Sequence, residues 1–249
     1  MANPVIHWEL GCKDADKMHA FLEGEFGWKI DKSEELNYHG VTAVGEHGIT
    51  GGIHDQLDGQ DPYLTFYVMV DDPQKFLDKA KSLGAQTAME PMEVPTVGTI
   101  AVFTEPTNGH RVGLFKPGDP NEPAPRTPGD NPVVHWEVAT KDPAALQNFF
   151  EQLFGWEFET MENLNYRIAK AGDTFGIGGG ILQTTEEIPP YVTIYTYVND
   201  LDQYTNKAST LGGTVIVPPM EISSEVGSMS IISGPDDPNP LGLFKGANE

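Results

Sequence analysis

The sequence predicts an α+β protein made of two tandem domains, and three observations lead to that prediction. A chain of 249 residues is long for one domain and comfortable for two of about 120 residues each. The stretch Val-Ile-His-Trp-Glu-Leu at 5–10 returns as Val-Val-His-Trp-Glu-Val at 133–138, 128 positions later (135 − 7 for the two histidines). Within each copy, strand-like runs alternate with two amphipathic helical runs. Such self-similarity indicates a duplicated domain.

The repeat continues to the end of the chain and sets the domain boundaries. Gly-Gly-Ile at 51–53 returns at 179–181, again 128 positions on (179 − 51), and Gly-Leu-Phe-Lys at 113–116 returns 129 on (242 − 113). Between the copies, residues 117–132 hold six prolines, which is typical of an extended linker. We therefore expect one domain at 1–117, a Pro-rich linker at 118–131 and a second domain at 132–249.

The first half opens with a strand and a helix. Residues 5–11 alternate in character as a half-buried strand does. Asp14 then supplies a helix-start signal, apolar residues keep helical spacing, and Gly27 supplies the stop. Three strands are expected to follow, at 28–31, 38–44 and 48–54.

The second unit of the first half repeats that order. The run at 63–70 is strongly strand-like, and Asp72-Pro73 begins a helix that ends at Leu83-Gly84. Strands are expected at 86–89, 99–104 and 110–116, the last two joined by the turn at 105–109. The order is βαβββ twice in this half, and the repeat predicts the same for the other.

Composition excludes several classes of function. A net charge of −22 repels nucleic-acid phosphates and anionic lipid headgroups, so we expect neither nucleic acid nor a membrane as a partner. No run approaches the roughly 20 apolar residues that a membrane-spanning helix needs. The single cysteine, Cys12, cannot form an internal disulfide, and the start of the chain has no targeting pattern. We therefore expect a cytoplasmic protein.

The repeated opening strand carries the candidate chemistry. Alternation places Trp8 with its apolar neighbours on one face of the strand, and His7 and Glu9 on the other. His135 and Glu137 repeat that pair. An unpartnered buried polar group costs on the order of 1–3 kcal/mol, so this face is either wet surface or the lining of a pocket.

The opening strand, the Phe-Gly-Trp after its helix and the closing Pro-x-Asn-Gly hairpin resemble the vicinal oxygen chelate superfamily of glyoxalases, bleomycin-resistance proteins and extradiol dioxygenases. The resemblance covers residues 4–117 and 132–246. It implies that the two βαβββ units of each domain form a curved eight-stranded sheet around a cleft, with helices outside. It also implies a small organic molecule as the ligand, with a homodimer as a further candidate assembly.

The resemblance also implies where a metal would bind. The family's three ligand positions fall at His7, Thr65 and Gly113 in the first domain. In the second domain they fall at His135, Thr193 and Gly242. A hydroxyl is a poor ligand beside imidazole, and glycine supplies no side chain at all. We therefore expect no cofactor, with a divalent metal (Fe, Ni, Zn or Mn) at His7 and His135 as the lesser alternative.

Alternation predicts what else each cleft contains. Tyr63, Thr65 and Tyr67 share the face of their strand that looks into the cleft, and the glycine on the last strand leaves space opposite. The predicted ligand-binding cleft residues are therefore His7, Glu9, Thr65, Tyr67 and Gly113 in the first domain, and His135, Glu137, Thr193, Tyr195 and Gly242 in the second.

Three functions stay open at this point. In the first, the protein binds a small molecule without the usual metal triad. Alternatively, it is an enzyme, a lyase, isomerase or dioxygenase with a non-standard metal or acid–base site at His7/Glu9 and His135/Glu137, for which Glu9 and Glu137 are the best catalytic candidates. In the third, the clefts are vestigial and the protein is an assembly module that uses its outer faces. The plainer interpretation of each histidine is a structural hydrogen bond to Glu9 or Glu137.

The remaining histidines and the glycine pairs receive plainer interpretations. The histidines without a counterpart in the other half are expected at the surface: His19, His39, His47, His54 and His110. Gly51-Gly52 and their counterparts are expected to let a strand bend.

Overall fold

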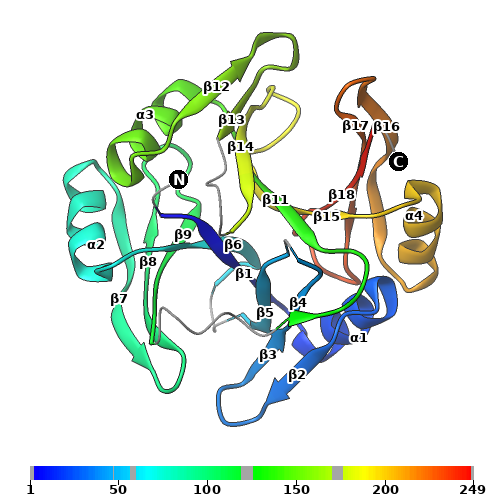
Figure 1. The fold of residues 1–249 in the computed structure, drawn as a ribbon, viewed down its shortest axis with the longest axis horizontal. Coiled ribbons are helices and arrows are strands. Elements are labelled where there is room, and N and C mark those ends of the chain that lie inside the picture. The colour runs from blue at the N-terminus through cyan, green and yellow to red at the C-terminus, as the bar shows by residue number, and fades with distance from the viewer. Residues whose placement is uncertain (1–2, 47, 57–59, 119–125, 170–175, 248–249) are drawn as a thin grey trace. The chain divides into compact units, whose positions relative to one another are not determined.

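A computed structural model of the protein describes residues 3–46, 48–56, 60–118, 126–169 and 176–247. The first half of the chain forms these elements in order (Figure 1): β1 Val5–Cys12, α1 Ala15–Phe26, β2 Ile30–Ser33, β3 Tyr38–Val41, β4 Ala43–Val44, β5 Thr50–Asp55, β6 Tyr63–Met69, α2 Pro73–Ser82, β7 Gln86–Val94, β8 Gly98–Thr104 and β9 Arg111–Pro117.

The second half repeats that series after a short extra strand. Its elements are β10 Arg126–Thr127, β11 Val133–Thr140, α3 Pro143–Phe154, β12 Phe158–Met161, the 3₁₀ turn Glu162–Leu164, β13 Tyr166–Ala169, β14 Gly178–Gln183, β15 Tyr191–Tyr197, α4 Leu201–Thr210, β16 Thr214–Ser223, β17 Gly227–Ser233 and β18 Leu241–Gly246.

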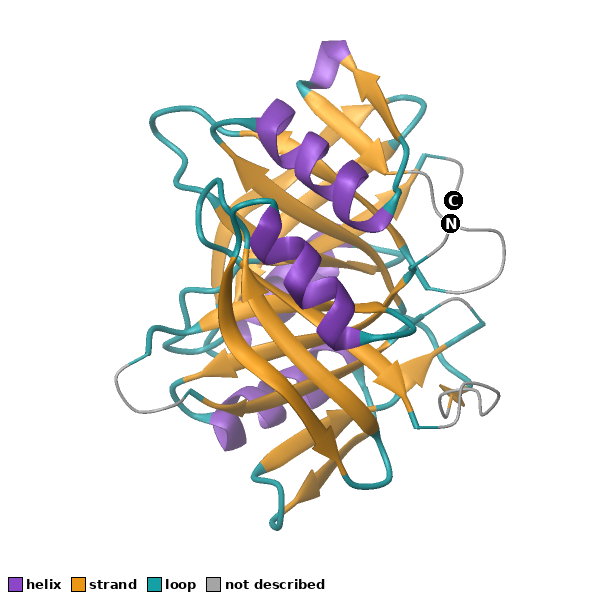
Figure 2. Ribbon diagram, turned by 90° about the vertical axis from the view of Figure 1, so that its left-hand side faces the viewer, coloured by secondary structure: helices purple, strands orange, loops and turns teal. Residues whose placement is uncertain are grey.

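Each half of the chain contributes one eight-stranded sheet. The strand orders are β2-β3-β5-β1-β6-β9-β8-β7 and β12-β13-β14-β11-β15-β18-β17-β16, so corresponding strands occupy corresponding places. Helices lie against the strands (Figure 2). The predicted α+β class and duplicated eight-stranded sheet are confirmed.

Contacts between residues divide the chain into two compact units, and each unit draws on both halves. Unit 1 comprises Met1–His7, Thr65–Ala124 and Trp136–Val192. Unit 2 comprises Trp8–Leu64, Pro125–His135 and Thr193–Glu249. The domain boundaries at 117 and 132 stay a prediction, and residues 119–125 of the predicted linker lie outside the described residues. Residues 126–127 form β10, which pairs in parallel with β4.

The helix boundaries follow from the capping residues that the sequence supplies. The Asp14 carboxylate accepts a hydrogen bond from the Lys17 amide at the start of α1, and Gly27 ends the helix in the left-handed conformation (φ 68°). Asp142 and Gly155 do the same for α3. The predicted starts and stops of these helices are confirmed.

A repeated Asn-Pro segment fixes the entry to each opening strand. In unit 1, the Asn3 side-chain amide donates to the Phe154 carbonyl, and the Trp156 indole donates to the Asn3 carbonyl at 2.9 Å. In unit 2, Asn131 makes the same two hydrogen bonds with Phe26 and Trp28. Both asparagines have positive φ (61° and 67°), which asparagine tolerates better than most residues. These bonds secure the chain just before His7 and His135.

One strand is longer than predicted. The run expected at 86–89 continues through Pro91 as β7 Gln86–Val94. Because β7 is the last strand of its sheet, a residue without an amide hydrogen costs no ladder hydrogen bond on the open side.

Candidate functional site

The first carboxylate cluster comprises Glu9, Tyr38, His54 and Tyr63, and all four belong to unit 2. The Tyr63 hydroxyl donates to Glu9 Oε1 over 3.1 Å. His54 Nε2 lies 2.9 Å from the same hydroxyl and 3.3 Å from Glu9 Oε1. The Glu9 and His54 side chains keep 14% and 16% of their surface exposed, so solvent reaches both.

The protonation of His54 follows from its surroundings. Its Nδ1 lies 2.8 Å from the Asp55 carbonyl oxygen, which can only accept, so Nδ1 carries a proton. Burial alone lowers the pKa of His54, but the hydrogen bond and charge of Glu9, together with Asp55, outweigh burial and raise the pKa above its ordinary value. Glu9 therefore favours the protonated imidazole, in which Nε2 also carries a proton.

Tyr38 completes the first cluster from β3. Its ring stacks on His54, with the centroids 6.3 Å apart. Burial, followed by the negative charge of Glu9, raises the pKa of Tyr38 well above its ordinary value, so the phenol stays protonated. A Cβ atom at Gly52 would lie 1.6 Å from the Tyr38 hydroxyl oxygen, so this glycine makes room for the phenol.

The second carboxylate cluster comprises Glu137, Tyr166 and Tyr191, all in unit 1. The Tyr191 hydroxyl donates to Glu137 Oε1 over 2.8 Å. Burial, then the charge and hydrogen bond of Glu137, raises the pKa of both Tyr166 and Tyr191. Glu137 is only 5% exposed. The position that corresponds to His54 (54 + 128) is Leu182, so this cluster has a buried carboxylate and two phenols but no imidazole.

Each predicted cleft histidine packs against a tyrosine ring. In unit 1, the rings of His7 and Tyr67 meet edge to face with centroids 5.6 Å apart. In unit 2, His135 and Tyr195 repeat this contact at 6.0 Å. Surrounding protein lowers the pKa of His135 to about 4, which keeps the imidazole neutral at physiological pH.

The two glycines on the closing strands do not leave open space, and that part of the prediction was wrong. Tyr67 pairs directly with Gly113 across β6 and β9, and a Cβ atom at Gly113 would lie 2.2 Å from the tyrosine ring. Tyr195 covers Gly242 in the same way, at 2.3 Å. The absent side chain is therefore replaced by an aromatic ring.

The residues at the family's ligand positions do not fit a metal ion. The Thr65 hydroxyl is fully buried and donates to the Arg111 carbonyl over 2.7 Å. Thr193 donates to the Pro240 carbonyl over 2.9 Å. With a tyrosine ring over each glycine, His7 and His135 are the remaining ligand candidates at these positions. In the part of the chain that the structure describes, no group of three or more His, Cys, Asp or Glu side chains is placed to hold a metal.

The unrepeated histidines are not all at the surface. His39 is 1% exposed, with its Nδ1 2.9 Å from Nδ1 of His19. His110 is half-buried, and burial lowers its pKa. His54 is the functional candidate that the sequence analysis missed, while His47 lies outside the described residues. The same-face alternation of His54 with Gly52 was the available signal, but the missing counterpart at 182 hid it.

The Gly-Gly pairs also have a different role from the predicted bend. A Cβ atom at Gly51 would lie 1.9 Å from the Trp8 ring. Trp8 therefore packs on one face of β5, and Tyr38 packs on the opposite face, at Gly52. Gly179 and Gly180 make the same room for Trp136 and Tyr166. Each pair thus lets one aromatic ring pack on each face of its strand.

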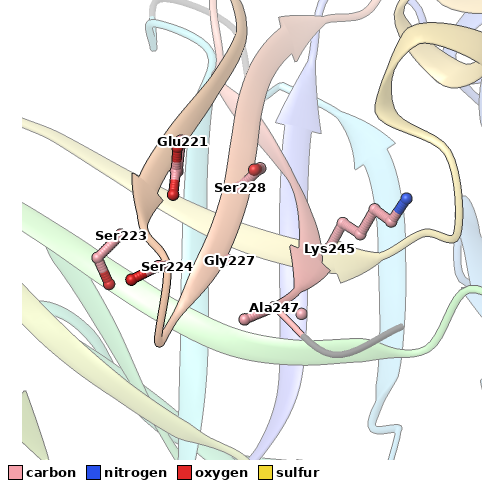
Figure 3. A pocket seen from close by; sticks show the side chains of 8 residues that line it. Glu221, Ser223, Ser224, Gly227, Ser228, Lys245 and Ala247 are labelled. Atoms are coloured by element: carbon pink, nitrogen blue, oxygen red, sulfur yellow. The ribbon is translucent and has the colours of Figure 1, made fainter.

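A separate hollow of about 270 Å³ lies on unit 2 at the β16–β17 hairpin. Glu221 and the serines line one side, and Lys245 extends away from them (Figure 3). None of its lining residues belongs to a carboxylate cluster.

Comparisons with known proteins give relatives along most of the chain. A protein of Mycobacterium tuberculosis named "Putative glyoxylase CFP32" is 30% identical over 236 residues, covering 91% of this chain and 89% of the relative. The anthracycline biosynthesis protein DnrV of Streptomyces peucetius is 25% identical over 226 residues, covering 84% and 82%.

Solved structures show the same fold. The Mn(II)-bound glyoxalase from Novosphingobium aromaticivorans superposes with a TM-score of 0.72 at 14% identity, covering all of this chain and 83% of that one. The 2,3-dioxygenase LapB from Pseudomonas sp. KL28 gives 0.69 at 13% identity, covering 99% and 93%.

A family model matches as well, over residues 5–114. Together with the full-length relatives and the duplicated sheets, this match shows that the chain belongs to the glyoxalase/bleomycin resistance protein/dioxygenase superfamily.

Proposed function

We propose that this protein binds a small organic molecule at its two carboxylate clusters. The observation that carries the proposal is the repetition of one polar arrangement: a glutamate on the central strand accepts a hydrogen bond from a tyrosine in each half of the chain. A convergent set of polar groups on aromatic walls is the usual make-up of a small-molecule site. A fold without a ligand has no need to keep such a group twice.

The chemistry of the clusters favours a ligand that donates hydrogen bonds. Ionised carboxylates only accept, and Tyr63 and Tyr191 already direct their protons at them. A ligand hydroxyl or a cationic nitrogen is the kind of group that donates to a carboxylate. The net charge of −22 opposes anionic ligands at the same time.

We infer that binding uses no metal. This part of the proposal rests on Thr65 and Thr193, whose hydroxyls are committed to backbone carbonyls, and on the glycines that tyrosine rings cover. No helix in the described part of the chain is long and apolar enough to cross a membrane. The cytoplasmic location, the absence of a nucleic-acid partner and the homodimer stay predictions.

The first cluster supports a second candidate function, acid–base catalysis of a lyase or isomerase type. Its basis is His54, which lies against Glu9 and Tyr63 and has no equivalent in the other half. A carboxylate paired with an imidazole, the side chain whose ordinary pKa lies nearest neutral pH, is suited to move a proton between two positions of a bound substrate.

Thermal unfolding with a panel of aromatic ligands tests the binding proposal. An anthracycline belongs in the panel because two relatives carry the name of anthracycline biosynthesis proteins. We expect one or more members of the panel to raise Tm in the wild type and to lose most of that effect in Glu9→Gln and Glu137→Gln. Glu221→Gln, at the separate hollow, is the matched control and should behave as wild type. A panel without effect, or equal shifts in all variants, contradicts the proposal.

A further inference from the structure

Two helix junctions in the molecule follow one plan. In unit 2, α1 packs against α4 (Figure 1). The Lys207 ammonium donates to the Glu25 main-chain carbonyl over 2.7 Å. In unit 1, α2 packs against α3, and Lys79 donates to the Leu153 carbonyl over 3.1 Å. The lysines correspond through the repeat (79 + 128), as do the residues whose carbonyls they bind (25 + 128).

Aromatic stacking repeats with the same geometry. Phe26 stacks on Tyr204 with ring centroids 6.1 Å apart and an interplanar angle of 19°. Phe76 stacks on Phe154 at 6.0 Å and 20°. The two junctions therefore share the same packing, so each can serve as a control for the other.

The chief difference is that unit 2 buries a carboxylic acid where unit 1 buries a leucine. Glu25 is fully buried, and neither of its carboxylate oxygens has a hydrogen-bond partner among the described residues. The Lys207 ammonium, whose charge acts on Glu25, donates to the backbone carbonyl of Glu25 and not to its carboxylate. A buried carboxylate without a donor is costly when ionised, whereas the protonated acid is a nearly apolar group that fits the junction.

Two influences act on the pKa of Glu25, and they have opposite signs. Burial raises the pKa of Glu25 to about 7, and the charge of Lys207 on α4 acts in the opposite direction. Among the described residues, the other charged or titratable groups paired with α1 lie at its first two turns. Lys32 pairs with Asp16, and the buried His39 lies 3.6 Å from Asp16 and 2.9 Å from His19. Asp55 on β5 accepts from the Ala15 amide, and Asp236 pairs with Lys17.

We propose that Glu25 is a proton-operated latch of the α1–α4 junction: the protonated acid seats the two helices, and ionisation loosens them. Unit 2, which holds the first carboxylate cluster, then responds to pH through this junction. The α2–α3 junction of unit 1, with Leu153 in the same place, does not. The inference is independent of the proposed ligand.

The sign of the effect follows from proton linkage. A folded-state pKa above the unfolded value means that the open junction binds fewer protons, so opening is favoured as pH rises from 4.5 through about 7. With those two values, the opening equilibrium grows roughly tenfold between pH 6 and pH 8.5.

Hydrogen exchange of the intact protein at pH 6 and pH 8.5 tests the latch. Protection factors, corrected for the intrinsic pH dependence of exchange, are compared for α1 and α4 and for α2 and α3. We expect protection of α1 and α4 to fall roughly tenfold at the higher pH while α2 and α3 stay level. Glu25→Leu, which copies the residue of unit 1, and Glu25→Gln should both abolish the fall.

The reciprocal Leu153→Glu variant should transfer the pH response to α2 and α3. If that variant does not fold, the two Glu25 variants still decide the matter. Equal protection of α1 and α4 at the two pH values in the wild type overturns the proposal. A fall that persists unchanged in Glu25→Leu overturns it as well.

Discussion

The two carboxylate clusters share a glutamate and two tyrosines but differ in the fourth position. In the second cluster, Leu182 stands where the first has His54, and Glu137 is 5% exposed with a 2.8 Å bond from Tyr191. In the first cluster, the corresponding bond to Glu9 is 3.1 Å, and His54 shares the same tyrosine hydroxyl. The comparison teaches that both halves carry the carboxylate, whereas only the first half carries an imidazole beside it.

The largest loss of stability is expected from substitutions in the glycine–tyrosine packing that the two halves share. Gly113→Ala and Gly242→Ala should each destabilise the protein by about 2–3 kcal/mol, because the new methyl group overlaps a buried tyrosine ring. Urea unfolding measures both. Similar losses would support equivalent packing in the two halves, while a loss in only one would break the equivalence.

A smaller and unequal effect is expected from removing the tyrosine hydroxyls. Tyr191→Phe should cost about 2 kcal/mol, since it takes a hydrogen bond from a buried charged group. Tyr63→Phe should cost about 1 kcal/mol or less, because Glu9 is partly exposed and His54 lies within 3.3 Å. Free energies of unfolding in urea decide the order, and a larger cost for Tyr63→Phe would contradict the account.

Replacing His54 by leucine should make the first cluster resemble the second and remove a pH-dependent contribution. Because the folded-state pKa of His54 is raised, its stabilisation is fully present below the unfolded value of 6.5 and is lost as pH rises through the folded value. The difference in unfolding free energy between wild type and His54→Leu should therefore be largest at acidic pH. Glu25 contributes equally to both proteins and cancels. A difference that grows with pH would be inconsistent with a raised pKa.

The smallest effect is expected from divalent metals. Titration calorimetry with Mn²⁺ and Ni²⁺ should show no stoichiometric binding, because the threonine and glycine positions add no ligand to His7 or His135. His7→Ala and His135→Ala should leave the titration unchanged. One equivalent of tightly bound metal that these substitutions abolish would restore the metal-dependent reading of the site.

Much of the fold was predictable because the repeat, the helix caps and the strand alternation all act over short stretches of chain. Alternation also placed Glu9 and Tyr63 on sheet faces from which they could meet. Strand register was not predictable from the same pattern. Without the register, the sequence did not show that Tyr67 lies beside Gly113, and the position of the glycine was predicted to be open space. The division into units that each combine both halves depends on long-range contacts that local patterns do not contain.

The candidate site was predicted less completely because matching the two halves favours what they share. His7 and His135 stood out through repetition, whereas His54 was set aside because position 182 holds leucine. Glu25 was hidden for the same reason, since Leu153 is its counterpart. In a duplicated chain, the two halves differ in chemistry at positions where one half has a titratable residue and the other half has an apolar residue.

An NMR titration of the His54 imidazole in wild type and Glu9→Gln tests the central claim most directly. We expect a pKa above the ordinary histidine value in the wild type and a clear fall in Glu9→Gln, where burial is left to favour the neutral ring. A wild-type pKa below the ordinary value, or one that the substitution leaves unchanged, would contradict the pairing of His54 with Glu9.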